Sequence, residues 1–450
     1  MKLDWPFILQ SLQGKLIGTI STEFKGISTD TRTIRPGDLY VALQGDMFDG
    51  HMFAKDALIK GASGVLVRKD AGLDILPRIE VDDPLTALQT LAGNVRKTVK
   101  IPVIAITGSH GKTTTKDILS SILAQSMKTR STFQNLNGLI GVPLTLMQLE
   151  EDDQVLVIEV GISKPGEMEI LAPLVSPTHA VFTCIAPAHS EFLPTLNDIV
   201  TEKLELAKWI IPGGRLFLNA DDPLLIRANK NRDAVLFGLI NGSYRASHLQ
   251  PSVDGMRFDV EEPMDDGGEL FLPLHGAHNV YNALGAVAVA RALGFSYSDI
   301  QKGLNSLVLS PHRSHIIRSS KLTIIDDAYN AAPGSMRCAL RLLADYPCKG
   351  RRIAVLGDML ELGSRSVAEH ESLGSSLKQY NLDVCIMFGE QMKWAYHQAV
   401  TTELVCFYCE QISQVIDELR KLSIKNDVIL VKASRSMRAE KIVEFLKSLV

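Results

Sequence analysis

The chain has 450 residues, a length that predicts roughly three domains of ordinary size. Hydrophobic residues make up 46% of it and charged residues 22%, which is the balance of a globular protein and excludes a disordered one. The formal net charge of -4 provides no basic surface, so no nucleic-acid partner is expected.

No segment has the character of a membrane span or a secretion signal. The first residues include Asp4 and Pro6 and no long apolar run. The most apolar helical segment, residues 283–293, is too short to cross a bilayer. The six cysteines are scattered, and only Cys406 and Cys409 form a C-x-x-C pair, with no second pair to complete a zinc site. Free thiols in a cytoplasmic protein are therefore expected.

The first unit, residues 1–98, has the pattern of a small α/β domain. Strands are predicted at 39–43 and 64–67, with a helix at 54–60 between them. A polar loop precedes the first strand and contains Ser28, Asp30, Thr31 and Arg32. Such a loop can hold the hydroxyl and phosphate groups of a ligand or can simply turn the chain, and its composition leaves both interpretations open.

A phosphate-binding turn is the strongest motif in the chain. The apolar, β-branched run at 101–106 predicts a buried strand, and residues 116–123 have a helical pattern. The turn between them consists of Gly108, Ser109, His110, Gly111, Lys112, Thr113 and Thr114. Its backbone N–H groups and the helix N-terminus can surround a phosphate, with Lys112 on the β- and γ-phosphates and the Thr113 hydroxyl on Mg²⁺. The alternative is a turn whose glycines serve only packing.

The second unit, residues 99–312, carries a candidate metal ligand at the end of its next strand. Residues 155–158 predict a buried strand, and Glu159 follows it. An acid at the carboxyl end of a parallel strand beside a phosphate turn can hold Mg²⁺, although a solvated glutamate is the alternative. The loop before this strand contains Asn135 and Asn137.

Lys203 lies on the apolar stripe of a predicted helix, where another apolar residue is expected. A lysine turned inward has a lowered pKa, and its neutral amine can react with CO₂ to give an anionic carbamate. Alternatively, the side chain reaches solvent from the stripe edge or pairs with Glu202 or Glu205. His189, in the preceding loop, is equally consistent with a ligand and with an ordinary loop histidine.

The rest of the second unit is predicted to contain antiparallel strands within 243–273, followed by an Ala-rich helix up to 293. Asn279 stands at the start of this helix, where capping alone would explain it.

The third unit, residues 313–450, has the alternating pattern of a Rossmann-like α/β domain. Its continuously apolar strands are predicted at 322–325, 353–356, 384–388 and 428–431, with a fifth candidate at 405–408. Polar residues follow the main strands, which predicts a site at that edge of the sheet. No GxGxxG motif is present, so a bound dinucleotide is not expected.

The phosphate turn, residues 107–114, resembles that of the Mur ligases, ATP-dependent enzymes that build the peptide of peptidoglycan. Segments 325–336, 355–363 and 431–435 are similar to the branch that adds D-alanyl-D-alanine, and residues 28–32 and 48–51 resemble its amino-terminal domain. The resemblance implies an α/β fold of three domains: a small N-terminal α/β domain, a central P-loop ATPase-like domain with a parallel sheet, and a C-terminal Rossmann-like domain.

The resemblance also implies a reaction and a set of roles. The enzyme would join UDP-N-acetylmuramoyl-tripeptide to D-alanyl-D-alanine in the cytoplasm, using ATP, two Mg²⁺ ions and an acyl-phosphate intermediate. Nothing in the sequence demands a protein partner, so a monomer is expected. Catalysis would involve Lys112, Glu159, His189 and Lys203. The metal ligands would be Thr113, Glu159, His189 and carbamylated Lys203. Besides the phosphate turn, ATP would contact Asn279, Arg313 and Asp327. The other substrates would contact Ser28, Asp30, Thr31, Arg32, Asn135, Asn137, Tyr329 and Asn330.

Three positions depart from the family pattern. His110 and Ala332 stand where Ser and Asn are more usual, and Gly138 replaces the second residue of an Asn-Asn pair. Two other interpretations of the chain are another Mur-type or folylpolyglutamate-synthase-like ligase and a non-enzymatic module gated by nucleotide. The identity of the third residue of the tripeptide, meso-diaminopimelate or L-lysine, stays open.

Overall fold

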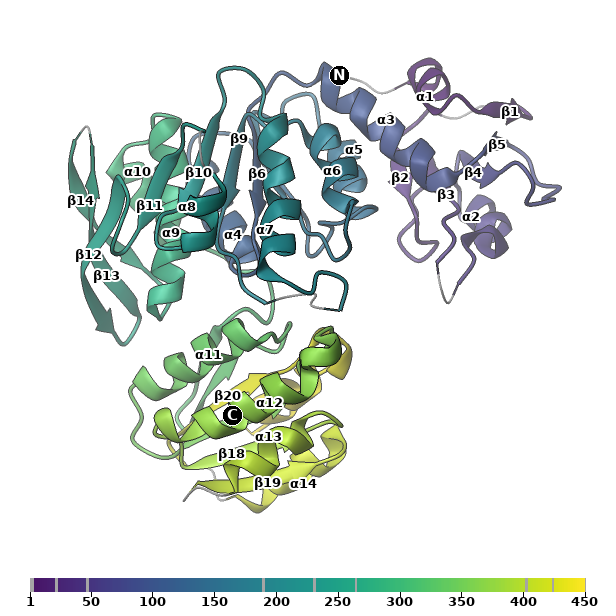
Figure 1. The fold of residues 1–450 in the computed structure, drawn as a ribbon. Helices are drawn as coiled ribbons and strands as arrows, with labels where there is room; N and C mark the ends of the chain where they lie inside the picture. Colours follow the sequence, from purple (N-terminus) through teal and green to yellow (C-terminus); the bar gives the residue numbers. More distant parts are fainter. Residues whose placement is uncertain are drawn as a thin grey trace.

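The computed structural model describes residues 4–20, 23–45, 48–187, 191–229, 232–263, 265–400, 404–422 and 425–449. Its strands form three sheets that follow one another along the chain. Figure 1 shows three bodies, with the N-terminal and C-terminal bodies attached to different sides of the central one. Within the described part of the chain, no helix combines the length and the apolar character that a membrane span requires.

The N-terminal body is built on a five-stranded sheet. Its elements are α1 (Trp5–Leu12), β1 (Lys15–Ile17), β2 (Gly26–Ser28), β3 (Asp38–Val41), η1 (Gly50–Phe53), α2 (Ala54–Ile59), β4 (Gly64–Arg68), β5 (Arg78–Val81) and α3 (Pro84–Thr98). The sheet order is β1-β5-β4-β3-β2, with only β1 antiparallel to its neighbour. Helix α3 begins at Pro84 because the Asp83 side chain caps it, and Arg96 near its end donates to the carbonyl oxygens of Val175 and Ser176. These two bonds attach the N-terminal body to the central one.

The central body contains a nine-stranded sheet. Its elements are β6 (Val103–Thr107), α4 (Lys112–Leu123), β7 (Thr129–Ser131), α5 (Gly141–Met147), β8 (Val155–Glu159), α6 (Glu167–Val175), β9 (His179–Phe182), α7 (Leu196–Leu204), η2 (Glu205–Trp209), β10 (Arg215–Asn219), α8 (Pro223–Ala228), β11 (Val235–Gly238), β12 (Tyr244–Ser252), β13 (Gly255–Glu262), β14 (Asp265–Leu272), α9 (Ala277–Ala292) and α10 (Tyr297–Asn305). The order is β14-β13-β12-β11-β10-β9-β6-β8-β7, and only β13 and β14 run antiparallel to their neighbours. The predicted parallel sheet with an antiparallel extension is confirmed.

Strand β6 shows how both faces of this sheet are covered. Val103 and Ala105 belong to the hydrophobic cluster that includes residues of α5, α6 and α7, whereas Ile104 and Ile106 belong to the cluster of α4 and α9. Successive side chains of a strand point to opposite faces, so a strand buried on both faces is apolar throughout. This places the carboxyl end of β6, and the turn that follows it, at an edge of the sheet between two layers of helices.

The C-terminal body has a six-stranded sheet. Its elements are β15 (His315–Arg318), β16 (Leu322–Asp326), α11 (Pro333–Asp345), β17 (Arg352–Gly357), η3 (Gly363–Arg365), α12 (Ser366–Ser376), η4 (Leu377–Gln379), β18 (Val384–Phe388), α13 (Met392–Ala399), β19 (Val405–Cys409), α14 (Ile412–Lys421), β20 (Asp427–Lys432), η5 (Arg435–Met437) and α15 (Glu440–Lys447). The order is β15-β16-β20-β17-β18-β19. The four main predicted strands and the fifth candidate, now β19, are confirmed.

Two details differ from the sequence-based expectation. Strand β15, an antiparallel edge strand, was not predicted, because its side chains are only half-buried and show no clear apolar pattern. Helix α4 begins at Lys112, about one turn earlier than the periodic pattern indicated, directly after Gly111 with its φ of 81°. All six cysteines are free thiols, as expected.

Candidate active site

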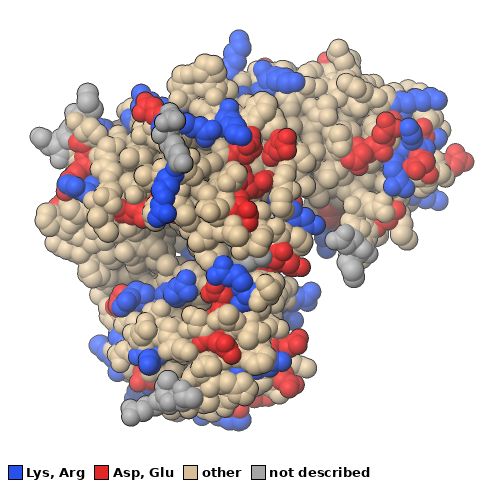
Figure 2. Space-filling model, viewed as in Figure 1, with Lys and Arg blue, Asp and Glu red and all other residues tan. Residues whose placement is uncertain are grey.

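A cavity of about 1450 Å³ lies between the central and C-terminal bodies. Its central wall contains the phosphate turn from Ser109 to Thr114, the strand-end residue Glu159 and the start of α9. The opposite wall contains the loop after β16, the start of α11 and the loop after β20. Figure 2 shows Lys and Arg side chains gathered along the edge of the C-terminal body that faces the central one. The side chains that line the cavity itself include six cations that can face the negative charge of a phosphate: Lys112, Arg313, Arg337, Arg341, Lys432 and Arg435.

The phosphate turn has room only for glycine at two positions. Gly108 has a φ of 144°, and a Cβ there would lie 2.0 Å from Thr183 Oγ1. A Cβ on Gly111 would lie 2.2 Å from Asn282 Oδ1. Lys112 is half-buried, and its Nζ donates to the carbonyl oxygens of Gly108 at 2.9 Å and Ser109 at 3.4 Å. The amine thus lies inside the turn, where a bound phosphate would meet it.

A hydroxyl and a carboxylate meet next to this turn. Thr113 Oγ1 donates to Glu159 Oε2 at 2.9 Å, and Asn137 Nδ2 donates to Glu159 Oε1 at 2.7 Å. Glu159 is only 2% exposed, and its backbone N–H donates to the hydroxyl of Thr132 at 2.9 Å. From the C-terminal body, Arg313 Nη2 donates to Thr113 Oγ1 at 3.2 Å. The two bodies are therefore in contact at the point where phosphate chemistry is expected.

Thr113 and Glu159 fit a magnesium ion. Mg²⁺ prefers hard oxygen ligands and usually takes one or two from protein, with substrate phosphates and waters completing its shell. Among the residues that the structure describes, no group of three His, Cys, Asp or Glu side chains is placed to hold a metal. His189, the predicted third ligand, lies outside the described residues. The hydroxyl and the carboxylate are the oxygen donors that the structure brings together.

The carboxylate of Glu159 provides a direct test of this site. Glu159→Gln keeps the side-chain shape but removes its charge, so the Mg²⁺ concentration for half-maximal activity should rise about tenfold or more, and the maximal rate should fall roughly 100-fold. Measuring the steady-state rate of phosphate release from ATP at increasing Mg²⁺ concentrations gives both the half-maximal Mg²⁺ concentration and the maximal rate. Glu150→Gln, which removes an exposed carboxylate paired with Lys128, is the matched control. An unchanged magnesium dependence in Glu159→Gln would remove Glu159 from the metal site.

Of the two placements considered for Lys203, the inward one is confirmed, because only 2% of the residue is exposed. Burial, together with the positive charge of Lys112, lowers the pKa of its amine to about 7. The two glutamates considered as partners are engaged elsewhere. Glu202 accepts a hydrogen bond from the Met168 N–H at 2.9 Å, and Glu205 pairs with Lys208. Lys203 is not among the cavity-lining residues, so it lies behind the wall rather than on it.

Asn279 lines the cavity from the first turn of α9 and is 3% exposed. The N-cap of this helix is Gly276, so the capping explanation of Asn279 is wrong. Its Nδ2 instead donates to the His275 carbonyl oxygen at 2.9 Å, and its Oδ1 accepts from Asn282 Nδ2 at 3.2 Å. These bonds fix the amide at the wall of the cavity.

Asp327 and Asn330 hold the C-terminal wall in place. Asp327 Oδ1 accepts from the Ser314 N–H at 3.0 Å, and its Oδ2 accepts from Lys432 Nζ at 2.5 Å. The same amine donates to the Asn330 carbonyl oxygen at 2.9 Å. Both residues line the cavity, as do Tyr329, Asn135 and Asn137. The structure thus brings most of the predicted site residues together.

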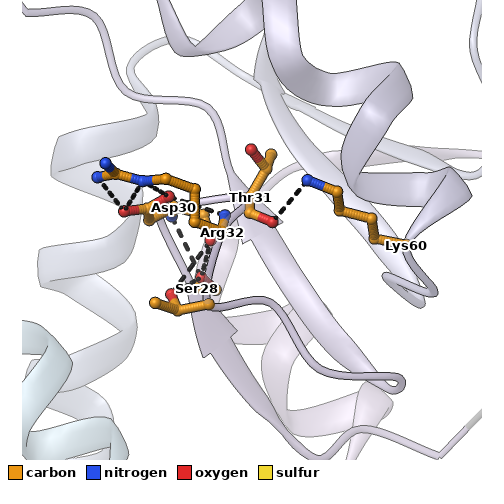
Figure 3. A network of polar contacts seen from close by, with 6 residues as sticks. Ser28, Asp30, Thr31, Arg32 and Lys60 are labelled. Carbon is orange, nitrogen blue, oxygen red and sulfur yellow. Dashed lines mark hydrogen bonds and ion pairs between the residues drawn. The ribbon is translucent and has the colours of Figure 1, made fainter.

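The polar loop of the N-terminal body is a separate feature, shown in Figure 3. Ser28 Oγ donates to the Asp30 carbonyl oxygen at 2.9 Å, and Lys60 Nζ donates to the Thr31 carbonyl oxygen at 3.1 Å. Arg32 donates to both carboxylate oxygens of Asp30, which lowers the pKa of that carboxyl. None of the four predicted loop residues lines the cavity.

Some residues that shape the site were missed from the sequence. Asn282 lies one helical turn after Asn279 and against Gly111 of the phosphate turn, where a Cβ would be 2.2 Å from its Oδ1, and this spacing could have revealed it. Thr132, which positions Glu159, follows the short strand β7 and carries no local signal. Arg435, which lines the cavity, was given no role of its own, although it is a polar residue at a strand end and the last residue of segment 431–435, which carries the resemblance.

Comparison with known proteins agrees with this geometry. Three family models match: "Mur ligase family, catalytic domain" at residues 23–96, "Mur ligase middle domain" at 106–290 and "Mur ligase, glutamate ligase domain" at 312–435. The UDP-N-acetylmuramoyl-tripeptide–D-alanyl-D-alanine ligase of Bacillus subtilis (strain 168) is 34% identical, covering 94% of this chain and 93% of the relative.

Two solved structures resemble the whole chain. MurF from Acinetobacter baumannii matches with a TM-score of 0.90 and 31% identity, over 98% of both chains. MurF ligase from Thermotoga maritima in complex with ADP matches with a TM-score of 0.83 and 27% identity, over 94% of this chain and 97% of that one. The chain belongs to the Mur ligase family.

Proposed function

We propose that this protein is a cytoplasmic ATP-dependent ligase that joins UDP-N-acetylmuramoyl-tripeptide to D-alanyl-D-alanine during peptidoglycan precursor synthesis. The observation that carries the proposal is the single cavity in which the phosphate turn, Glu159 and the C-terminal residues Arg313 and Tyr329 meet. The name of the Bacillus subtilis relative and the ADP in the Thermotoga maritima structure support it.

The reaction would have two steps. In the first, the terminal carboxylate of the tripeptide attacks the γ-phosphorus of ATP, which forms an acyl phosphate and releases ADP. In the second, the amine of the dipeptide attacks the acyl carbon, phosphate leaves, and the amine loses its proton. Lys112 and Arg313 place positive charge where negative charge develops on the transferred phosphoryl group, which is the largest catalytic contribution in such reactions.

Thr113 and Glu159 would hold one Mg²⁺, and His189 and a carbamylated Lys203 would contribute to a second. Bound magnesium neutralises phosphate charge and fixes the geometry of the phosphates. The carbamate would form when the neutral amine of Lys203 attacks CO₂, making an N–C bond and releasing one proton. An amine with a pKa of about 7 is largely neutral just above neutral pH, which favours this reaction.

The other substrate roles follow the three bodies. Ser28, Asp30, Thr31 and Arg32 would bind the uridine nucleotide, whereas Asn135, Asn137, Tyr329 and Asn330 would bind the reacting peptides. We place the domain boundaries at residues 98/99 and 312/313, with hinges near 97–101 and 310–313. The protein would act as a monomer that closes around its substrates.

Phosphate release by the purified protein with Mg·ATP tests the function. A panel of UDP-muramoyl peptides, each with and without D-alanyl-D-alanine, should give release only when a UDP-muramoyl tripeptide and the dipeptide are present together. The active member of the panel would also identify the third residue of the tripeptide. ATP hydrolysis that ignores both substrates would contradict the proposal, and release with a single amino acid in place of the dipeptide would point to another ligase of this fold.

A further inference from the structure

Arg435 presents a lightly paired guanidinium group to the cavity. It begins η5, directly after β20, and 57% of its side chain is exposed. Its ion-pair partner is Glu440, at the long distance of 3.7 Å. Lys432, three residues earlier, is instead held by Asp327 at 2.5 Å and by the Asn330 carbonyl oxygen at 2.9 Å. Of these two cations, Arg435 is the one available to a ligand.

The ring of Tyr329 links Arg435 to the centre of phosphate chemistry. The guanidinium carbon of Arg313 lies 3.9 Å from the centroid of this ring, and that of Arg435 lies 5.5 Å from it. Arg313 in turn donates to the hydroxyl of Thr113. Arg435 is therefore linked to the hydroxyl beside the phosphate turn through Tyr329 and Arg313.

The C-terminal wall of the cavity contains small and apolar side chains as well as polar ones. Ala331, Ala332 and Leu360 line it, together with the carboxylate of Glu361. The buried hydroxyl of Ser434 accepts from the Leu360 N–H at 2.9 Å and donates to the Ala331 carbonyl oxygen at 3.4 Å. Through these two hydrogen bonds, Ser434 holds the segments that contain Leu360 and Ala331 next to Arg435. Such a surface can contact the methyl groups of D-alanyl-D-alanine while the arginine faces the charged end of the dipeptide.

We propose that Arg435 binds the free carboxylate of the incoming dipeptide while the dipeptide amine faces the acyl phosphate. The proposal rests on the proposed function and extends it, because it makes a C-terminal carboxylate a required feature of the second substrate. An arginine can bind a carboxylate through two parallel hydrogen bonds, which gives orientation as well as affinity.

Two other arginines on the C-terminal wall also line the cavity. They lie on a helix that borders the part of the cavity where ATP is expected. Arg337 and Arg341 belong to α11. At the start of this helix, a Cβ on Gly334 would lie 3.0 Å from His110 Nε2 of the phosphate turn. At its end, the ring of Tyr346 packs on His275, with centroids 5.1 Å apart, and His275 accepts the Asn279 amide bond. Helix α11 therefore runs from the phosphate turn toward Asn279.

Steady-state kinetics of Arg435→Ala test the proposal. The KM for D-alanyl-D-alanine should rise roughly 10- to 100-fold, with kcat at saturating dipeptide and the KM values for ATP and the UDP-muramoyl tripeptide within about twofold of wild type. Arg435→Lys should recover part of the loss, because it keeps the charge without the planar pair of donors. Arg420→Ala removes an exposed arginine that pairs with Asp417 on α14, and should change nothing.

The C-terminally amidated dipeptide separates charge recognition from general damage. Wild type should use it with the same high KM that Arg435→Ala shows for the free dipeptide, and Arg435→Ala should not weaken it further. If wild type ligates normally and Arg435→Ala keeps the wild-type KM for the dipeptide, the inference about Arg435 is wrong while the proposed function stands. The same conclusion follows if Arg435→Ala raises only the KM for the UDP-muramoyl tripeptide. No dipeptide-dependent phosphate release by wild type would overturn the proposed function as well.

Discussion

Replacing Lys112 by alanine should reduce the rate of ADP formation in a single turnover by about 100- to 1,000-fold. The amine of Lys112 is held inside the phosphate turn, 2.9 Å from the Gly108 carbonyl oxygen, and burial lowers its pKa. Because this donor is already in position before the reaction, little reorganisation energy is required when negative charge develops on the γ-phosphate. Its removal should raise the barrier by about 3 kcal/mol or more.

The Lys112→Ala protein should remain folded, since the hydrogen bonds that its side chain donates go to the Gly108 and Ser109 carbonyl oxygens within the turn itself. Thermal unfolding with and without Mg·ADP distinguishes a lost catalytic group from a lost fold. Lys302→Ala, which removes an exposed lysine paired with Asp299 on α10, is the matched control and should keep the wild-type rate. Full activity of Lys112→Ala would exclude the phosphate turn from the reaction.

Local patterns predicted the parts of this fold whose environment is the same along a whole element. The strand before the phosphate turn, β6, is apolar from Val103 to Ile106 because helices cover both faces of its sheet. Lys203 could be singled out because it interrupts an otherwise apolar stripe, but the stripe alone left open whether its side chain turns inward or reaches solvent. The resemblance to the family implied the inward placement, and the residue is buried.

Local sequence patterns could not predict the contacts between the central and C-terminal bodies. Arg313 meets Thr113 across 200 positions of the chain. This contact depends on how two domains approach each other, which no local periodicity encodes. Within the C-terminal body, Arg435 meets Tyr329 because the strands before them, β20 and β16, lie side by side, and local patterns do not encode this pairing either. For the same reason, the loop around Asp30 could be recognised as polar from its composition, whereas its position off the cavity could not.

Replacing Lys203 by methionine should stabilise the protein in CO₂-free buffer while it abolishes most of the activity. The folded-state pKa of about 7 lies below the ordinary lysine value of 10.5. Between these two pH values the unfolded chain binds more protons than the folded chain does. The free energy of unfolding of wild type therefore rises with pH through this window, and the full cost of burying the amine is present at pH 7 and below. Methionine carries no such cost, and the gain at pH 7 should be at most about 4 kcal/mol.

Denaturant unfolding at several pH values measures this difference, which should shrink as the pH approaches 10.5. Lys116→Met is the matched control. Lys116 is also buried, at 3% exposure, but it pairs with Asp117 at 2.8 Å and donates to the Thr132 carbonyl oxygen at 3.0 Å. Its removal takes the cation from Asp117, which keeps its hydrogen bonds from Ser310, and takes the Nζ donor from the Thr132 carbonyl oxygen, so this variant should lose stability.

The activity of Lys203→Met should fall roughly 100-fold or more, because the variant cannot form a carbamate near the metal site. Wild type incubated with ¹³C-bicarbonate should give a carbamate carbon signal by NMR that Lys203→Met lacks, and this signal should weaken as the pH falls below 7 and the amine becomes protonated. Removal of CO₂ should slow wild-type ligation over the same pH range. A Lys203→Met protein that ligates at the wild-type rate would contradict the carbamate, and one less stable than wild type at pH 7 would contradict the cost of burying the amine. Lysine at this position is thus expected to lower stability and to be retained for its chemistry.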